Sequence, residues 1–260
     1  MKPLLAPRIG VDLDKLRSNI VYLADVVVDF DGFKALQINE FTVHFNELRV
    51  VIGPNGAGKT TLCDVISGKT RVTQGRVHFN LRETTHLSEV EIASLGVGRK
   101  FQTPTVFDSI TVYENMELAL PGRRGVWRNL FARRTPAERD RILSLLQRVH
   151  LADDLHTEAR FLSHGQRQWL EISMLIVAEP KLLLIDEPAA GLTDRETELT
   201  AELLLELRGQ HTIIVIEHDM DFVRRLNAQV TVLNEGKVLA EGSMQEVQAH
   251  PDVIEAYLGR

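Results

Sequence analysis

One stretch constrains the fold of this chain more than any other, the nine residues Gly53-Pro-Asn-Gly-Ala-Gly-Lys-Thr-Thr61. They fit the pattern G-x-x-x-x-G-K-[ST], in which the glycines, the lysine and the threonine occupy fixed positions. A β-branched run at residues 48–52 precedes the stretch and predicts a strand, and residues 60–66 predict the start of a helix. The Lys-Thr pair and these flanks favour a phosphate-binding loop over the alternative, a simple glycine-rich turn.

The chemistry of this loop suits a nucleoside triphosphate. Glycine lets the backbone adopt positive φ and approach an anion closely. The N–H groups of the loop and the N-terminus of the following helix then face the phosphates. The Lys59 side chain can reach the β- and γ-phosphates, and the Thr60 hydroxyl can hold Mg²⁺. The predicted phosphate-binding residues are Gly53, Pro54, Asn55, Gly56, Ala57, Gly58, Lys59, Thr60 and Thr61.

Composition limits the class of protein. The 260 residues suffice for one large α/β domain or a core with a subdomain, and the net charge of −6 argues against a nucleic-acid partner. Cys63 is the only cysteine, which excludes an internal disulfide and indicates a reducing compartment. No apolar run approaches the roughly 20 residues that span a bilayer, and residues 1–10 lack the apolar segment of a signal peptide. We expect a cytosolic protein, or one bound to a membrane only through a partner.

The N-terminal part predicts an extension followed by strands. Residues 1–20 are weakly patterned and are interpreted as an extension. Residues 23–30 are rich in valine, and residues 41–45 alternate apolar and polar side chains, as half-exposed strands do. Together with residues 48–52, they predict an antiparallel sheet that leads into the phosphate loop.

Several helices are expected to begin at capping boxes. Ser88, Thr111, Thr135 and Thr193 each precede a glutamate by three residues, which is the spacing of this motif. The basic segment at residues 121–134 could in isolation bind nucleic acid, but we favour a solvated segment or one that contacts lipid headgroups or an acidic partner. Near the C-terminus, two short apolar runs flank Asn234-Glu-Gly236 and predict a hairpin.

Two carboxylates follow a predicted buried strand. Residues 181–186 are apolar almost throughout, as expected for a strand buried on both faces, and they end at Asp186 with Glu187 next. Ligands of open α/β sheets bind at the carboxyl ends of the strands. Asp186 can support Mg²⁺ directly or through water, and Glu187 is placed to polarise a water molecule for attack on the γ-phosphate. The alternative is a polar strand end without chemistry, which the phosphate loop upstream disfavours.

A third motif is Leu162-Ser-His-Gly-Gln166. Ser163 and Gln166 have capping-box spacing, so a helix is expected to begin there with a partial positive charge suited to a phosphate. In isolation the motif would be only a capped helix. It resembles the signature sequence of the ATP-binding cassette (ABC) family, in which glycine is more usual at the position of His164. Ser163, Gly165 and Gln166 match that family, and the resemblance covers about residues 21–258, after the N-terminal extension.

Further residues match positions of that family, and the resemblance implies their roles. Gln102 corresponds to the glutamine that meets Mg²⁺ and the attacking water and senses the membrane partner. Residues 212–216 predict a second buried strand. His218, which follows this strand, corresponds to the switch histidine at the γ-phosphate. Asp194 corresponds to the aspartate of the D-loop, the segment that follows the two strand-end carboxylates. Phe30 corresponds to the aromatic residue that stacks on adenine, with Phe33 as the competing candidate.

The resemblance implies an α/β fold of the P-loop NTPase (RecA-like) type, with an antiparallel β subdomain and an inserted α-helical subdomain at about residues 103–175. Two cassettes are expected to sandwich two molecules of ATP with Mg²⁺, and Ser163 and Gly165 of each would act on the nucleotide of the other. Hydrolysis through Glu187 and His218 would reopen the dimer and drive integral membrane permease subunits. The second cassette is expected to be a different chain, with a homodimer as the alternative. The expected location is peripheral, at the cytoplasmic face of the bacterial inner membrane.

Finer features resemble one group within the family, the ATP-binding subunits of urea importers. They are residues 96–107, 162–171 and 253–260. That group is similar to the importers of branched-chain amino acids. Urea import is therefore the first expectation, and import of branched-chain amino acids or short amides is the alternative. A soluble ATPase acting in assembly or repair and a non-catalytic scaffold remain as further alternatives, although the retained Glu187 and His218 weigh against the scaffold.

Overall fold

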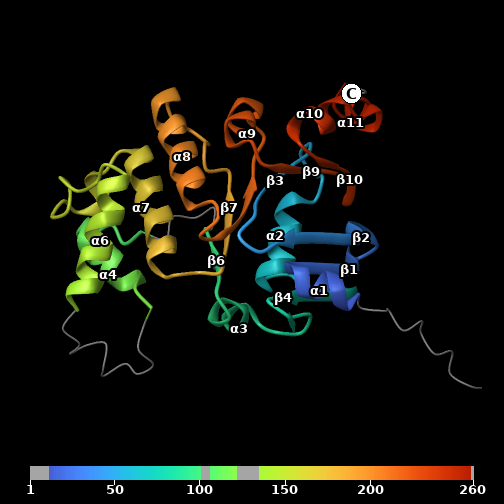
Figure 1. Cartoon of the computed structure of the whole chain (residues 1–260), viewed down its shortest axis with the longest axis horizontal. Helices are drawn as coiled ribbons and strands as arrows, with labels where there is room; N and C mark the ends of the chain where they lie inside the picture. The colour runs from blue at the N-terminus through green and yellow to red at the C-terminus, as the bar shows by residue number, and fades with distance from the viewer. Residues whose placement is uncertain (1–11, 101–105, 122–134, 259–260) are drawn as a thin grey trace, which may run out of the picture. The chain divides into compact units, whose positions relative to one another are not determined.

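The computed structural model describes residues 12–100, 106–121 and 135–258 (Figure 1). Two compact units divide the chain, the first comprising Met1–Leu95 with Asn227–Arg260 and the second Gly96–Leu226. Each unit combines strands with helices, in agreement with the predicted α/β class. The phosphate loop belongs to the first unit, whereas the strand-end carboxylates and the Ser163 motif belong to the second.

The first unit contains a four-stranded sheet in the order β2-β1-β4-β5. Its strands are antiparallel: β1 (Asn19–Phe30), β2 (Phe33–His44), β4 (Gln74–Phe79) and β5 (Arg82–Glu83). Leu23 of β1 lies opposite Phe41 of β2, and both side chains are buried. The two strands predicted at residues 23–30 and 41–45 are therefore confirmed as an antiparallel pair.

Strand β3 (Leu48–Ile52) does not belong to that sheet, so the prediction that it extends the antiparallel sheet was wrong. It pairs in parallel with β9 (Gln229–Asn234), with Val51 opposite Thr231. All five residues of β3 are buried, as is usual for a strand covered on both faces. Burial of β3 explains why residues 48–52 are mostly apolar, but it does not indicate which strand pairs with β3. Strand β9 continues into the antiparallel strand β10 (Lys237–Gly242), which confirms the predicted hairpin.

Regular secondary structure is present before residue 20. A helix, α1 (Leu13–Ser18), lies within the stretch interpreted as an extension, and the Asp12 side chain accepts hydrogen bonds from the N–H groups of Asp14 and Lys15. Strand β1 then starts at Asn19, because Ile20 and Tyr22 already contribute to the core. The sequence patterns did not predict this helix; the assignment of residues 1–20 as an N-terminal extension stays a prediction, and residues 1–11 lie outside the described part.

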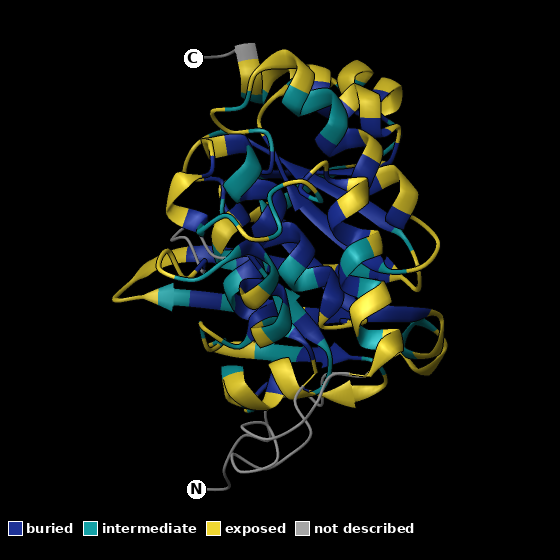
Figure 2. Ribbon diagram, turned by 90° about the vertical axis from the view of Figure 1, so that its left-hand side faces the viewer, coloured by how far each residue is buried: buried dark blue, intermediate teal, exposed yellow. Residues whose placement is uncertain are grey.

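The second unit contains three parallel strands in the order β8-β7-β6. They are β6 (Val97–Arg99), β7 (Leu182–Asp186) and β8 (Thr212–Ile216). Every residue of β8 is buried. In Figure 2, where buried residues are dark blue, the buried residues lie mainly on the strands in the interior. Parallel strands with both faces covered read as continuous apolar runs, which is why the sequence predicts β7 and β8 well.

Helices complete both units. Besides α1, those of the first unit are α2 (Lys59–Ser67), α3 (Glu89–Ser94), α10 (Met244–Ala249) and α11 (Pro251–Leu258). Those of the second are α4 (Val112–Ala119), α6 (Pro136–Arg148), α7 (His164–Val177), α8 (Asp194–Leu207) and α9 (Met220–Leu226). Helices α4, α6 and α7 contact one another. They fall mainly within the predicted helical subdomain, whose limits at residues 103 and 175 stay predictions. Residues 122–134, which hold the predicted basic segment, lie outside the described residues.

Complete capping boxes begin six of these helices, α3, α4, α6, α7, α8 and α10. In each box, the Ser or Thr hydroxyl accepts a hydrogen bond from the backbone three residues on, and the Glu or Gln there accepts one from the backbone of the cap. The five boxes predicted from the sequence are confirmed. Because each motif needs only four consecutive residues, these helix starts are fixed locally.

Candidate nucleotide-binding site

The phosphate loop joins β3 to α2 in the first unit. Gly58 precedes the helix with φ +98°, and a Cβ at this position would lie 2.8 Å from the Ala35 oxygen and 2.9 Å from Leu36 Cδ2. Only glycine fits both the left-handed backbone and this close approach. No side chain caps the start of α2, in contrast to the capping boxes described above. The first N–H groups of α2 are therefore open to an anion, as the predicted phosphate site requires.

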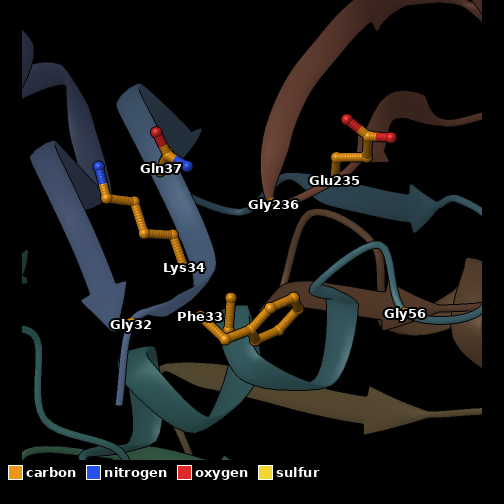
Figure 3. A pocket seen from close by; sticks show the side chains of 8 residues that line it. Gly32, Phe33, Lys34, Gln37, Gly56, Glu235 and Gly236 are labelled. Carbon is orange, nitrogen blue, oxygen red and sulfur yellow. The ribbon is translucent and has the colours of Figure 1, made fainter. Parts of the chain in front are cut away.

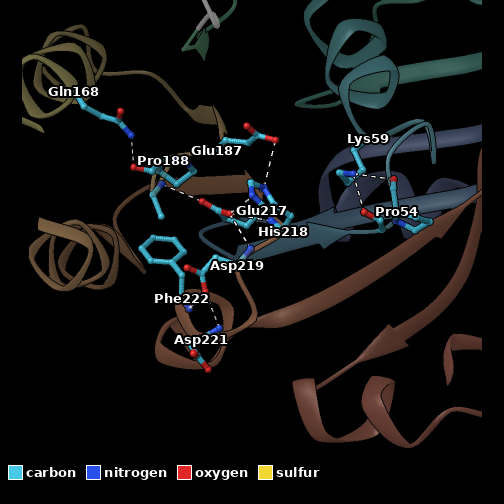
Figure 4. Close-up of polar contacts among 12 residues, drawn as sticks. Pro54, Lys59, Gln168, Glu187, Pro188, Glu217, His218, Asp219, Asp221 and Phe222 are labelled. Atoms are coloured by element: carbon cyan, nitrogen blue, oxygen red, sulfur yellow. Dashed lines mark hydrogen bonds and ion pairs between the residues drawn. The ribbon is translucent and has the colours of Figure 1, made fainter. Parts of the chain in front are cut away.

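The Lys59 side chain lies along the phosphate loop. Its Nζ donates hydrogen bonds to the backbone oxygens of Gly53, at 2.8 Å, and Pro54, at 3.0 Å (Figure 4). The residue is only 9% exposed, although the neighbouring Thr60 is exposed. The loop thus has three features that suit the phosphates of ATP. Its backbone can approach the phosphates closely, the Lys59 ammonium is held along the loop, and the Thr60 hydroxyl is accessible.

A pocket of about 550 Å³ lies beside the phosphate loop in the first unit. It is lined by Gly32, Phe33, Lys34, Ala35, Gln37, Gly56, Glu235 and Gly236 (Figure 3). Phe33 is 68% exposed, and it lines the pocket together with Gly56 of the phosphate loop. Phe30, the residue favoured from the sequence, is 51% exposed, and of the two phenylalanines the structure places Phe33 in the pocket.

The second unit holds the two strand-end carboxylates. Asp186 is the last residue of β7, and Glu187 follows in the left-handed region with φ +49°. The Glu187 N–H donates to the Ile216 oxygen at 2.9 Å, which ties the end of β7 to the end of β8. Glu187 Oε1 then lies 3.4 Å from His218 Nδ1 (Figure 4). The structure therefore brings together the predicted base and the predicted switch histidine, and both side chains remain accessible to a ligand.

The signature motif also belongs to the second unit, where Ser163 caps α7. The Gln166 side chain accepts from the Ser163 N–H at 3.0 Å and donates to Asp154 Oδ2 at 2.9 Å. A Cβ on Gly165 would overlap the Glu196 carboxylate of α8, so a larger residue here would require the Glu196 side chain to move. Asp194 is the first residue of α8, as predicted from its capping box.

His164, which stands where the family more often has glycine, contacts the D-loop of the same unit. Its Nε2 lies 3.3 Å from the Ala190 oxygen, within hydrogen-bond distance. Of the other predicted residues, Gln102 lies outside the described residues.

Buried charges near β6 and β7 escaped the sequence analysis. Lys100 and Glu171 are each less than a tenth exposed, and Lys100 Nζ lies 3.8 Å from Glu171 Oε2. Burial lowers the pKa of Lys100, whereas the carboxylates of Glu171, Asp186 and Glu217 act in the opposite direction. Lys100 follows β6 directly, and its sequence gave no signal of burial, because charged residues are usually solvated.

The residues present suit ATP and Mg²⁺. Oxygen atoms are the ligands that Mg²⁺ prefers, and the Thr60 hydroxyl of the first unit and the Asp186 carboxylate of the second unit each offer oxygen atoms of this kind. Within the described ranges, no cluster of three or more His, Cys, Asp or Glu side chains could hold a metal by itself. No helix among the described residues is long and apolar enough to cross a membrane.

Comparison with known proteins decides the family. The family model described as "ABC transporter" matches residues 36–190, more than half of the chain. The chain belongs to the ABC transporter ATP-binding family. A second family model, described as "Branched-chain amino acid ATP-binding cassette transporter", matches residues 237–260 of this cassette.

Individual relatives agree with this assignment. The cassette is 38% identical to the high-affinity branched-chain amino acid transport ATP-binding protein LivG of Salmonella typhimurium, over 86% of this chain and 92% of the relative. It is 36% identical to LivG of Escherichia coli, over 90% and 95% of the two chains. The crystal structure of a nucleotide-free ATP-binding cassette from an ABC transporter superposes with a TM-score of 0.80 at 30% identity, covering 93% of this cassette and all of that chain. An ADP-bound cassette gives a TM-score of 0.79 at 30% identity, covering 93% and 99%.

The cassette is therefore an ABC-type ATPase of an importer, in which ATP hydrolysis is coupled to transport. Membership of this family implies membrane permease partners and cassettes that work as dimers. The expectation of urea as the cargo is not supported by these relatives, whose names give branched-chain amino acids instead.

Proposed function

We propose that this cassette hydrolyses ATP to drive the import of branched-chain amino acids. The observation that carries the proposal is the match of residues 237–260 to the branched-chain amino acid cassette model. The LivG and BraF relatives support the same cargo, since they cover most of the chain at 34–38% identity. Urea rests only on the resemblance of three short segments, so it becomes the second candidate in the uptake experiment below.

In the proposed reaction, the first unit binds the nucleotide. The open N–H groups of the phosphate loop and of α2 take the phosphate oxygens, and the Lys59 ammonium moves from the Gly53 and Pro54 oxygens to the β- and γ-phosphates. Thr60 and Asp186, with Gln102, would hold Mg²⁺, which neutralises charge on the phosphates.

The carboxyl ends of β7 and β8 supply the proposed chemistry. Glu187 accepts the proton of the attacking water, which general-base catalysis makes more nucleophilic. His218, 3.4 Å from Glu187, donates a hydrogen bond toward the γ-phosphate as its charge develops. Glu187 stands in a strained conformation at φ +49°, which is common where the backbone must aim a functional side chain.

The signature helix would act on a second cassette. Ser163 and Gly165 lie at the start of α7, where Ser163 is exposed, and the positive end of the helix dipole suits the phosphates bound to the partner cassette. We infer a heterodimer with a second, different cassette, bound to permeases at the cytoplasmic face of the bacterial inner membrane. Asp194 of the D-loop would lie at the same dimer interface.

Phe33 is proposed to stack on the adenine in place of Phe30. The alanine variant of Phe33 is expected to weaken ATP binding about tenfold, because stacking of a base on an aromatic ring contributes about 1–3 kcal/mol. The Phe30→Ala variant is the matched control, since this residue is also exposed and lies on the same sheet. Titration calorimetry with ATP measures both dissociation constants. A larger loss in the Phe30 variant would return the role to Phe30.

Uptake of labelled leucine and labelled urea tests the cargo. Cells that carry Glu187→Gln are expected to lose leucine uptake and keep urea uptake, because transport depends on ATP turnover by this cassette. Cells that carry Glu202→Gln, a change at an exposed carboxylate of α8, serve as the control. Loss of urea uptake alone would replace the proposed cargo by urea. Loss of neither, with the variant present at normal levels, would favour an ATPase without a transport role.

A further inference from the structure

Glu217 is a charged residue that the proposed mechanism leaves without a role. It follows β8 directly and precedes His218, yet it is only 1% exposed. Burial of a carboxylate is costly unless hydrogen bonds and opposite charges compensate for the lost water. A fully buried glutamate beside a reaction centre therefore needs a structural or functional reason.

The Glu217 carboxylate accepts three backbone hydrogen bonds. Oε2 accepts from the N–H groups of His218, at 2.8 Å, and Asp219, at 3.2 Å. Oε1 accepts from the N–H of Ala189, at 3.0 Å. The carboxylate thus joins two segments that are 28 residues apart in the chain (Figure 4).

These two segments carry the proposed catalytic pair. Ala189 lies two residues after Glu187 in the D-loop, and His218 begins the segment after β8. The D-loop is also held from a second direction, because the Gln168 amide of α7 donates to the Pro188 oxygen (Figure 4). One buried side chain directly after β8 and one from α7 therefore fix the turn that follows Glu187.

The charge of Glu217 is compensated within the same unit. Besides the three N–H donors, the buried ammonium of Lys100 interacts with Glu217 as well as with Glu171 and Asp186. Charge-assisted hydrogen bonds of this kind are stronger than those between neutral groups. An ionised carboxylate has two acceptor oxygens and no donor, so it can bind both segments at once.

We propose that Glu217 is a positioning residue for ATP hydrolysis, which clamps the D-loop to the segment of His218 and so holds His218 against Glu187. The inference rests on the roles proposed above for Glu187 and His218. In this proposal Glu217 has no direct role toward the nucleotide or the attacking water. It acts through the backbone of the two segments on either side of the site.

The Glu217→Gln variant tests the clamp with almost no change in volume. The amide keeps one acceptor oxygen, and its NH₂ group must face at least one of the backbone N–H donors. We expect kcat of the full chain to fall at least about tenfold, as for loss of a hydrogen bond to a charged group, while KM for ATP changes less than about twofold. Glu202→Gln is the matched control and should leave both constants unchanged.

A double-mutant cycle separates positioning from a general loss of structure. If Glu217 acts through His218, the Glu217→Gln change should lower kcat in the wild-type background and have little further effect in the His218→Ala background. Losses that multiply in the double variant would overturn the proposal. A kcat for Glu217→Gln equal to that of the Glu202 control would also overturn it.

Hydrogen–deuterium exchange provides a readout that does not depend on ATP turnover. The amides of His218 and Asp219 should be protected in the wild type and exchange at least about tenfold faster in Glu217→Gln. Equal exchange in both proteins would refute the clamp. Failure of the proposed catalytic roles would give a different result. Glu187→Gln or His218→Ala would then keep the wild-type kcat, whereas the two amides would still exchange faster in Glu217→Gln.

Discussion

Glu187→Gln should lower kcat for ATP hydrolysis by about 10²- to 10⁴-fold, which is the usual contribution of a positioned general base. Glutamine has nearly the same shape as glutamate but cannot accept the proton of the attacking water. It can occupy the left-handed conformation of Glu187, so the turn at the end of β7 should persist. The Glu187 N–H bond to the Ile216 oxygen belongs to the backbone and is kept as well.

The same variant should still bind ATP. The proposed contacts to the phosphate chain come from the loop at Gly53–Thr61 in the first unit, which the substitution leaves unchanged. Steady-state phosphate release measures turnover, and calorimetric titration measures ATP binding, with Glu202→Gln as the control for a change of charge. A kcat within about twofold of wild type would remove Glu187 from the role of base.

Lys59→Met should weaken ATP binding by about 10- to 100-fold, the range expected for loss of a hydrogen bond to a charged group. Methionine fills a similar apolar volume but carries no ammonium for the phosphates. In the structure, Lys59 already holds the loop through the Gly53 and Pro54 oxygens. ATP must therefore compete with these two hydrogen bonds, and the measured loss is the difference between the two sets of contacts.

Lys69→Met provides a matched control for the Lys59 variant. Lys69 lies just beyond α2 in the same unit, is exposed, and forms an ion pair of 3.7 Å with Asp64. Removal of this exposed charge should change the dissociation constant for ATP less than about twofold, because exposed ion pairs contribute little. Calorimetric titration with ATP and Mg²⁺ compares the two variants. Equal affinities for both would exclude Lys59 from the phosphate site.

Local motifs account for what the sequence could predict. The phosphate loop, the strand that ends at Asp186 and five capping boxes each depend on fewer than about ten consecutive residues, and the structure contains all of them. The family resemblance implied that Glu187 and His218 both act in hydrolysis, and the structure brings them together because β7 and β8 are adjacent parallel strands.

Contacts between distant segments could not be predicted in the same way. The pattern of residues 48–52 indicates a buried strand, but its partner β9 begins at Gln229, far along the chain. Glu217 gave no signal either, because its role depends on the Ala189 amide of another segment. Phe30 and Phe33 have similar surroundings in the sequence, and only the fold of β2 places Phe33 in the pocket.

The capping boxes give the protein a shared response to acid. The pKa values of Glu91, Glu114, Glu196 and Glu246 lie below the ordinary value of 4.5, because each carboxylate accepts hydrogen bonds from the backbone and hydroxyl of its own cap. A group whose pKa is lowered by folding stabilises the fold above its unfolded pKa, and this contribution is lost as the pH falls through the folded value. Two of these helices, α3 and α10, belong to the first unit, and α4 and α8 belong to the second. Falling pH therefore removes this kind of support from both units, because each unit holds two of the four carboxylates.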